Sequence, residues 1–158
     1  MPKIIIIAAV SENNVIGKDG AIPWNIREDL QHFKQLTTGF PCIMGRNTYL
    51  SLPRKPLPNR PNIIISSTLK DAPDGVFIFT SLKEAISSFD TYEKIFICGG
   101  SSIYKEAVTI ADEIELTRVH GIYEGDTFFP VINMDDWDEV NTIRHTGFSY
   151  ITLRRKKQ

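Results

Sequence analysis

One acidic residue interrupts an otherwise apolar stripe between residues 26 and 37. On a helical wheel of ~100° per residue, one continuous arc holds Leu36, Asp29, Phe33, Ile26, Thr37 and Leu30. Asp29 is the only charge in that arc, and the polar residues of the segment, including His32, fall on the opposite face. Burying a carboxylate alone costs desolvation free energy, and a cationic or donor-rich ligand offsets that cost. Asp29 is therefore a candidate ligand-binding group, although the helix macrodipole alone would also favour an acid at this position.

Two glycine-containing segments could hold phosphate. Gly45, Arg46 and Thr48 follow an apolar run at a predicted helix start, where backbone N–H groups and a guanidinium can bind an anion. Gly99 and Gly100 follow another apolar run, so the backbone there can approach a pyrophosphate closely. Each signal is weak alone, because arginine is mostly a surface residue and paired glycines commonly serve turns.

Two long connections carry further candidates. Residues 13–25 link the first predicted strand to the first helix and contain Trp24, and loops of this length inside a domain are usually functional. Residues 53–61 are proline-rich, and the fixed φ angles of the prolines on either side limit the freedom of Arg60. A core role for Trp24 and a solvated surface role for Arg60 are the alternatives.

The net charge and the scattered cysteines and histidines argue against several classes of function. A formal net charge of -1 provides no global field to attract nucleic acid or an anionic membrane. Cys42 and Cys98 each lie in an apolar run and are expected to pack as buried thiols. His32, His120 and His145 lack the local spacing of a zinc site, so no metal is expected. Without a signal peptide, a spanning segment or a disulfide framework, a cytoplasmic protein is expected.

The elements that must position these residues follow an α/β pattern. Apolar runs rich in β-branched residues predict about eight strands, at residues 4–10, 42–44, 62–66, 76–79, 95–98, 113–119, 137–143 and 148–153. Helix-like stretches lie at residues 26–37, 82–89 and 102–108, and a further helix start follows residue 45. Asn25 with Glu28, and Ser81 with Glu84, have capping-box spacing. We expect one domain over residues 1–158, with a mostly parallel sheet, an antiparallel C-terminal edge hairpin and about four flanking helices.

The order of these segments resembles the dihydrofolate reductases of the bacterial chromosomal type over nearly the whole chain. The matching residues are Val15-Ile16-Gly17, Ile22-Pro23-Trp24, Asp29-Leu30 with Phe33, Ile43-Met44-Gly45-Arg46 with Thr48, Leu57-Pro58 with Arg60, Gly99-Gly100 with Ile103-Tyr104, Leu116-Thr117, and Glu124-Gly125-Asp126-Thr127 with Phe129-Pro130. Two departures stand out: Ser101 replaces a glycine common in the family, and the loop at residues 53–61 is one residue longer than in the enterobacterial pattern.

The resemblance implies hydride transfer from NADPH to C6 of 7,8-dihydrofolate, with protonation of N5, to form tetrahydrofolate for one-carbon metabolism. It implies catalytic roles for Asp29, Ile22, Trp24 and Thr117. The implied substrate contacts are Ile7, Asp29, Leu30, Phe33, Leu52, Arg60, Cys98, Tyr104 and Thr117. The implied cofactor contacts are Ala9, Ile16, Gly17, Trp24, Gly45, Arg46, Asn47, Thr48, Ser66, Ser67, Gly99, Gly100, Ser101, Ser102, Ile103 and Thr127.

The resemblance also implies specific tasks for the polar residues. Asp29 is expected to bind the 2-amino and N3 edge of the pterin, with Thr117 hydrogen-bonded to the carboxylate and solvent supplying the N5 proton near Ile22. Arg60 is expected to pair with the α-carboxylate of the glutamate tail, and Arg46 with the 2′-phosphate of NADPH.

A mobile loop completes this interpretation. The segment around Ile22 is expected to close over the nicotinamide together with residues 124–129, as lids do when chemistry must be shielded from water. Asp126 is expected to hydrogen-bond the loop backbone near Gly17 or Lys18.

Two rival functions stay open at this point. One is a riboflavin-pathway pyrimidine reductase of similar fold, and the other is a catalytically silent pterin- or nucleotide-binding module. Asp29 and Arg60 favour folate over a sugar phosphate, and a silent module gives no reason for a complete nicotinamide site. Expected partners are dihydrofolate and antifolate diaminopyrimidines or pteridines, bound by a monomer that contacts neither nucleic acid nor membrane.

Overall fold

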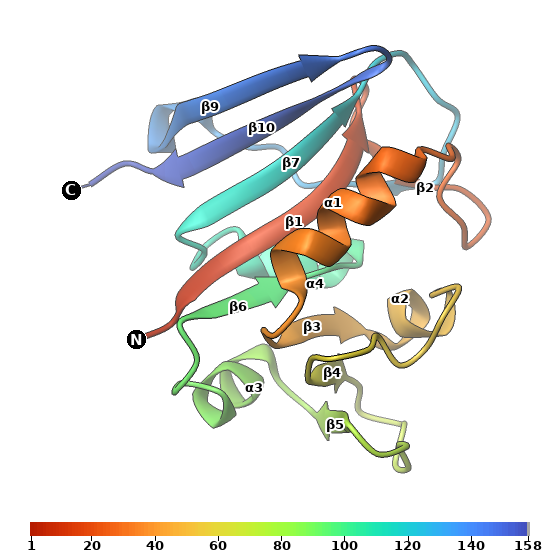
Figure 1. The fold of residues 1–158 in the computed structure, drawn as a ribbon, viewed down its shortest axis with the longest axis vertical. Coiled ribbons are helices and arrows are strands. Elements are labelled where there is room, and N and C mark those ends of the chain that lie inside the picture. Colours follow the sequence, from red (N-terminus) through yellow and green to blue (C-terminus); the bar gives the residue numbers. More distant parts are fainter. Residues whose placement is uncertain (158) are drawn as a thin grey trace.

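Eight strands form one sheet in the computed structural model, which describes residues 1–157 (Figure 1). The strand order is β5-β4-β3-β6-β1-β7-β10-β9. Neighbouring strands from β5 to β7 run parallel, and the C-terminal hairpin adds the last two strands antiparallel. The predicted sheet and its edge hairpin are therefore confirmed. The strand bounds are β1 (Lys3–Ser11), β3 (Cys42–Gly45), β4 (Asn62–Ile65), β5 (Val76–Phe79), β6 (Lys94–Ile97), β7 (Glu113–Val119), β9 (Trp137–His145) and β10 (Phe148–Arg155).

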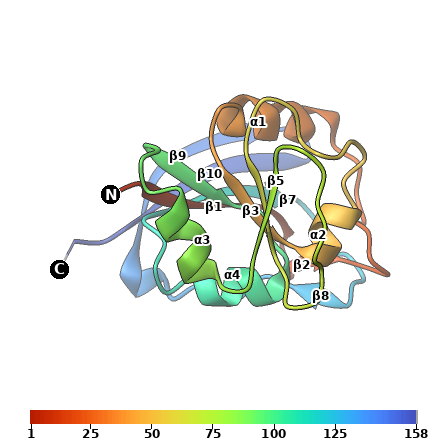
Figure 2. The ribbon, with the colours of Figure 1, turned by 90° about the horizontal axis from the view of Figure 1, so that it is seen from below.

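Alternate side chains of the central strand β1 enter two separate core clusters. Ile4 and Ile6 pack in one cluster, and Ile5 and Ile7 in the other, which explains why this strand is apolar throughout. Helices α3 (Leu82–Ser88) and α4 (Ser101–Ala107) cover the first face, whereas α1 (Arg27–Thr37) and α2 (Arg46–Leu50) cover the second. Figure 2 shows α1 on one side of the sheet and α3 and α4 on the other.

The two predicted capping boxes have different outcomes. Ser81 is the N-cap of α3, and its hydroxyl accepts a hydrogen bond from the Glu84 N–H at 3.1 Å. The prediction for Asn25 is wrong, because α1 begins at Arg27 and its N-cap is Ile26, which has no side-chain acceptor. The extended backbone of Ile26 places the helix start one residue later than predicted, so Asn25 lies outside the capping position.

A second, two-stranded sheet was not predicted. It pairs β2 (Val15–Gly17) with β8 (Thr127–Phe128), and the two segments lie far apart in the sequence. Both strands are too short to give an alternating pattern of their own, so the sequence does not distinguish them from loop. Their pairing holds the connection before α1 against the segment that follows β7.

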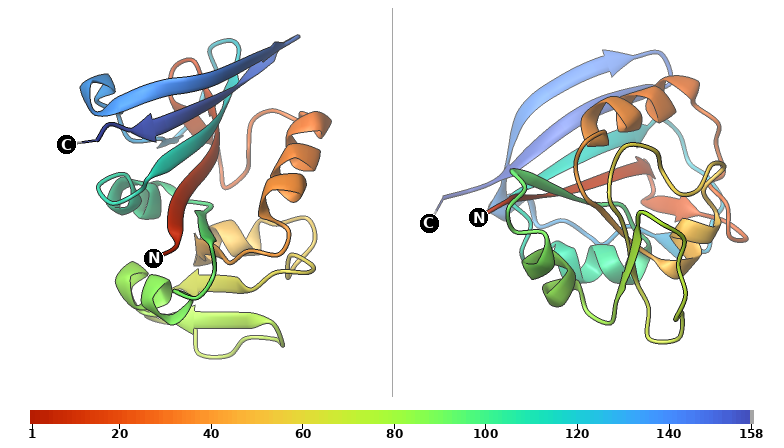
Figure 3. Two further views of the ribbon diagram at one scale, coloured as in Figure 1. Left: turned by 60° about the vertical axis from the view of Figure 1, so that its left-hand side comes forward. Right: turned by 60° about the horizontal axis from the view of Figure 1, so that its bottom comes forward.

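The C-terminal hairpin continues the sheet past β7, as Figure 3 shows from two directions. Its outer strand β9 is an edge strand with mostly exposed side chains. Charged residues on it, including Asp138, Glu139 and Arg144, disfavour pairing with another chain. A short 3-10 helix, Met134–Asp136, leads into this strand. Within residues 1–157, no helix is long and apolar enough to cross a membrane.

Candidate active site

Asp29 and Thr117 meet across the interface between α1 and β7. The Thr117 hydroxyl donates a hydrogen bond to Oδ1 of Asp29 at 2.5 Å, as predicted. Thr117 itself is buried, and β7 holds it in register with Ala9 of β1. Burial raises the pKa of the Asp29 carboxyl above its ordinary value, while the Thr117 hydrogen bond and the nearby His32 act in the opposite direction. The carboxylate is thus anchored at one oxygen and poorly hydrated, which favours a ligand that offers hydrogen-bond donors.

Four of the apolar side chains predicted to line a ring-binding cleft pack in one cluster on the sheet face that α1 covers. They are Ile7, Phe33, Leu52 and Cys98. Two other predicted wall residues, Ile22 and Leu30, are 60% and 57% exposed, so they lie at the rim rather than in the core. The amphipathic stripe of α1 is therefore less buried than its pattern predicted, and Thr37 is its only fully buried residue.

Arg60 is buried and held in place by the structure. Its Nε donates to the Pro58 carbonyl at 2.7 Å, and its Nη1 donates to the Thr37 hydroxyl at 2.7 Å. Neither hydrogen bond uses Nη2. A fixed guanidinium at the far end of α1 from Asp29 can bind a carboxylate without losing much side-chain freedom on binding. The surface alternative for Arg60 is therefore wrong.

The two glycine segments lie side by side at the carboxyl ends of β3 and β6. Gly45 N–H donates to the Gly99 carbonyl at 2.8 Å. Gly99 has φ +115, and a Cβ on it would lie 3.2 Å from the Tyr104 ring, so glycine is required there. Gly45 and Gly100 are the N-caps of α2 and α4, and neither end has a side-chain cap. The open backbone N–H groups therefore fit a phosphate-bearing ligand.

Arg46 lies beside the hydroxyls that follow β4. Its Nη1 donates to the Thr68 hydroxyl at 3.3 Å, and the Thr68 and Ser66 hydroxyl oxygens are 3.4 Å apart. Arg46, Ser67 and Thr68 are exposed. A guanidinium surrounded by hydroxyls suits a phosphate group at the surface. The remaining predicted cofactor contacts at Asn47, Thr48, Ser101, Ser102 and Ile103 lie in the first turns of α2 and α4.

The loop before α1 is tied to the segment after β7. The Asp126 N–H donates to the Gly17 carbonyl at 3.0 Å, and the Asp126 carboxylate accepts from the Asp19 N–H at 2.9 Å. The latter contact lowers the pKa of Asp126. Lys18 and Glu124 form an exposed ion pair at 2.9 Å. The expected contact between Asp126 and this part of the loop is present, with Asp19 rather than Gly17 or Lys18 donating to the carboxylate.

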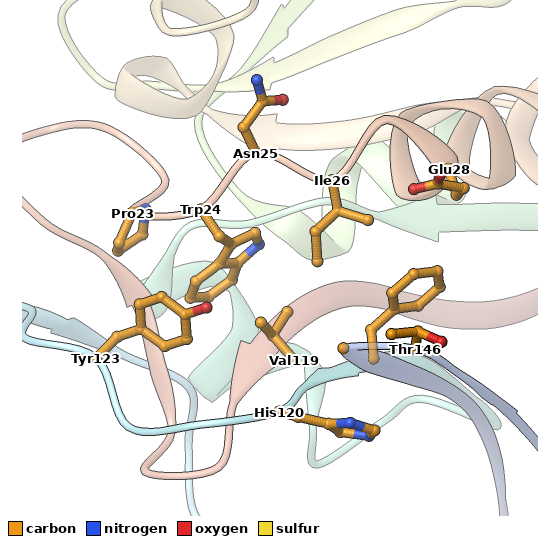
Figure 4. A pocket seen from close by; sticks show the side chains of 11 residues that line it. Pro23, Trp24, Asn25, Ile26, Glu28, Val119, His120, Tyr123 and Thr146 are labelled. Carbon is orange, nitrogen blue, oxygen red and sulfur yellow. The ribbon is translucent and has the colours of Figure 1, made fainter.

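A cavity of about 470 Å³ opens beside Trp24 (Figure 4). Figure 4 shows the Trp24 indole beside the Tyr123 ring, and the two rings meet edge to face with centroids 5.1 Å apart. The wall is shared by the loop before α1, the end of β7 and the turn of the hairpin. Ile26 and Glu28 line it, whereas Asp29 is not among its lining residues. No sequence signal predicted it, because three distant segments form it.

Two aromatic residues have roles that the sequence analysis did not anticipate. The Tyr104 hydroxyl, expected to touch substrate, donates to the Ile7 carbonyl at 2.8 Å and is buried, which raises its pKa well above the ordinary value. Tyr150 was not singled out, yet its ring stacks on His32 with centroids 3.8 Å apart. His32, which the helical wheel assigns to the polar face, is therefore half-buried. A helical wheel for α1 alone cannot detect a neighbouring strand that covers its polar face.

Comparisons with known proteins agree with this geometry. The model of the Dihydrofolate reductase family matches residues 3–152. A dihydrofolate reductase of Neisseria meningitidis serogroup A is 44% identical over 139 residues, which span 88% of this chain and 86% of that protein. One of Bacillus subtilis is 36% identical over 143 residues, spanning 90% and 84%. The structure of dihydrofolate reductase from Enterococcus faecalis, complexed with NADP(H) and RAB-propyl, superimposes with a TM-score of 0.87 at 33% identity, covering 98% of this chain and 97% of that one.

Proposed function

The chain belongs to the dihydrofolate reductase family and reduces dihydrofolate with NADPH, and we propose that Asp29 is the side chain that binds and orients the pterin ring in that reaction. The observation that carries the proposal is the Thr117 hydrogen bond to Asp29 Oδ1 in a half-buried setting. It leaves Oδ2 and the second lone pair of Oδ1 free to accept from the 2-amino group and N3 of the pterin. Two such bonds fix the ring plane as well as its position.

The chemistry at N5 needs a proton, and Asp29 favours it indirectly. A carboxylate hydrogen-bonded to the 2-amino and N3 edge stabilises positive charge on the pterin, which makes N5 easier to protonate. Solvent that enters past the exposed Ile22 is the proposed donor, because the residues proposed above for the cleft include no acid besides Asp29. Asp29 thus holds and polarises the substrate and does not itself deliver the proton.

The backbone around Gly45, Gly99 and Gly100 is the proposed binding site for the cofactor pyrophosphate. Their open N–H groups and the lack of side chains at these positions support it. NADPH, when bound, supplies the hydride from its nicotinamide ring. Arg46 with Ser66 and Ser67 is the proposed contact for the 2′-phosphate, which would select NADPH over NADH. The proposed surroundings of the nicotinamide are Ala9, Ile16, Gly17, Trp24 and Thr127.

Arg60 is the proposed partner of the glutamate α-carboxylate of the substrate. Its fixed guanidinium and its place beyond Thr37, at the opposite end of α1 from Asp29, suit a substrate with a ring at one end and an anion at the other. This pairing favours folate over a sugar phosphate and argues against a riboflavin-pathway reductase. We further propose that the loop around Ile22 closes with residues 124–129, supported by the Asp126 and Lys18 contacts that already join them.

Inhibitor binding, cell compartment and oligomeric state follow from the same features. Antifolate diaminopyrimidines and pteridines carry the same amino edge as the substrate and should compete for Asp29. The free thiols of Cys42 and Cys98 are consistent with the reducing cytoplasm. A monomeric state of a single domain is retained as a prediction, which sedimentation of the purified protein would test.

Replacing Asp29 with asparagine tests the main proposal. The change keeps the shape and the Thr117 contact but removes the negative charge. We expect hydride transfer at neutral pH, followed by loss of NADPH absorbance with dihydrofolate, to fall by about 10²-fold, and to recover as falling pH protonates the substrate in solution. Glu28→Gln, an exposed neighbour on the same helix, is the matched control. An unchanged rate at neutral pH in Asp29→Asn would contradict the proposed role.

A further inference from the structure

Two directly paired residues on neighbouring strands of the sheet, Thr117 and Tyr150, contact helix α1 at successive positions around Asp29. Thr117 of β7 and Tyr150 of β10 are directly opposite each other in the antiparallel pair, so their side chains lie on the same face of the sheet. Thr117 donates to the Asp29 carboxylate at 2.5 Å, and the Tyr150 hydroxyl donates to the Glu28 carbonyl at 3.2 Å. This residue pair thus binds α1 twice: Tyr150 at the backbone just before Asp29, and Thr117 at the side chain of Asp29.

Tyr150 also contacts the helix one turn later. Its ring stacks on the imidazole of His32 with centroids 3.8 Å apart and an angle of 17° between the planes. The Glu28 carbonyl is also the acceptor that helix geometry assigns to the His32 N–H. Tyr150 therefore clamps both ends of the turn that carries Asp29. Elsewhere, α1 packs on the sheet through apolar side chains such as Phe33 and Leu36.

The charged and titratable groups facing His32 come from its own helix and from the hairpin. Asp29 and Glu28 lie on α1, Tyr150 lies on β10, and His145 of β9 packs edge-on against the Tyr150 ring at 5.2 Å. Burial lowers the pKa of His32, Asp29 raises it and His145 lowers it. His32 in turn lowers the pKa of Asp29. The charge on each of these two side chains therefore depends on the other.

We propose that Tyr150 and His32 are positioning residues for Asp29: the Tyr150 hydroxyl and ring hold the helical turn that carries the carboxylate, and His32, three residues further along α1, lies next to Asp29 on the helix surface as a titratable neighbour. The proposal rests on the role of Asp29 given under the proposed function. It predicts that both residues act on dihydrofolate binding and on the pH dependence of hydride transfer, without touching the reacting atoms. A purely structural role predicts a loss of stability alone.

Two conservative variants separate the parts of the clamp. Tyr150→Phe keeps the stacked ring and removes the hydroxyl that binds the Glu28 carbonyl. His32→Phe keeps a ring for stacking and removes the titratable group. Lys34→Gln is the control, because Lys34 is an exposed charge on the same helix. For each variant, the thermal midpoint, the Kd values for NADPH and dihydrofolate, and the hydride-transfer rate between pH 5 and pH 9 are measured.

We expect Tyr150→Phe to weaken dihydrofolate binding about 3- to 10-fold, as loss of one hydrogen bond allows, with NADPH binding unchanged. His32→Phe should shift the midpoint of the hydride-transfer profile to higher pH by a few tenths of a unit, about what a weak surface ion pair contributes. Lys34→Gln should leave both measurements unchanged. If Tyr150→Phe and His32→Phe lower only the thermal midpoint, the pair is packing and the proposal is wrong.

A double-mutant cycle shows whether Tyr150 acts through Asp29. If it does, adding Tyr150→Phe to Asp29→Asn should cost little further dihydrofolate affinity, because the group being positioned is already gone. Additive losses would contradict the positioning role while leaving the role of Asp29 intact. Conversely, an Asp29→Asn enzyme with unchanged hydride transfer would overturn the proposed function itself, so the two failures are distinguishable.

Discussion

The Thr117 hydroxyl lies 2.5 Å from Oδ1 of Asp29 and donates a hydrogen bond to it. A strand that is buried on both faces supplies this hydroxyl, whereas the carboxylate comes from the first turn of a helix that covers the sheet. Because β7 is held between β1 and β10, the donor cannot shift to follow a movement of the helix. The position of the carboxylate is therefore set by the rigid sheet rather than by the loop that precedes it.

Thr117→Val should impair the enzyme through Asp29. Valine keeps the shape but leaves Oδ1 without its donor, so the pKa of Asp29 should rise further and the hydride-transfer profile should move to higher pH. Dihydrofolate binding should weaken about tenfold, the range for losing a hydrogen bond to a charged group. Thr142→Val, at an exposed position on β9, serves as the control. A pH profile that overlays that of the parent enzyme would show that the hydroxyl does not act on the carboxylate.

Asp29→Asn should stabilise the ligand-free protein at neutral pH even as it impairs catalysis. The pKa of Asp29 is raised above its ordinary value of 3.8, chiefly by burial. The folded state therefore binds this proton more tightly than the unfolded state, so the ionised carboxylate opposes folding above the folded-state pKa. This opposition is relieved as pH falls through that pKa and is absent below the unfolded value.

Thermal unfolding of the two proteins at several pH values checks this expectation. At pH 7 the Asp29→Asn midpoint should be higher than that of the parent enzyme, because the amide carries no charge for burial to oppose. The difference should shrink as the pH approaches 4. A midpoint that is equal or lower at pH 7 would mean that the carboxylate is already stabilised within the folded chain and is not held ready for a ligand.

Much of the fold could be predicted from the sequence because the sheet is buried on both faces. Continuous apolar runs such as residues 4–10 and 95–98 leave little choice but internal parallel strands. Asp29 could be singled out for the same reason, since one charge breaks a regular apolar pattern. The two-stranded sheet of β2 and β8 could not be predicted, because Val15 and Phe128 meet only through the tertiary fold.

The contact between His32 and Tyr150 shows which part of the candidate site the sequence could not predict. A helical wheel assigns each residue to a face, but it assumes that the polar face meets solvent. Here the C-terminal hairpin covers part of that face, and an imidazole stacks on a phenol ring there. The capping prediction for Asn25 was wrong for a local reason: the cap position depends on the backbone conformation of Ile26, which residue spacing does not reveal.

Arg60→Lys should weaken binding of dihydrofolate far more than binding of a dihydropterin that lacks the glutamate tail. Lysine keeps the charge but cannot bond the Pro58 carbonyl, the Thr37 hydroxyl and a carboxylate in the same planar arrangement. We expect KM for dihydrofolate to rise about 10- to 100-fold, with the tailless pterin unaffected. Arg144→Gln, an exposed arginine on β9, is the control. Equal increases in KM for both substrates would indicate that Arg60 stabilises the fold and does not bind the glutamate tail.

Gly125→Ala should disrupt the tie between the loop before α1 and the segment after β7. A Cβ at Gly125 would overlap the Val15 side chain and would lie 2.7 Å from the Gly17 carbonyl oxygen, which is backbone and cannot rotate away. The β2–β8 pair must therefore separate or shift, which moves Gly17 and the Asp126 contact with it.

NADPH affinity and hydride transfer are the measurements that check this expectation, because the loop residues Ile16 and Gly17 are proposed to border the nicotinamide. We expect both to fall by about tenfold, together with a loss of about 1–3 kcal/mol in the free energy of unfolding from overpacking. Ile122→Ala changes a side chain in the same segment that is 74% exposed, and it should have no effect on either measurement. Adding Val15→Ala to Gly125→Ala removes the side-chain overlap but not the contact with the Gly17 carbonyl, so it should restore activity only in part. Full activity in Gly125→Ala alone would mean that the β2–β8 pair is not needed to hold the loop over the cofactor.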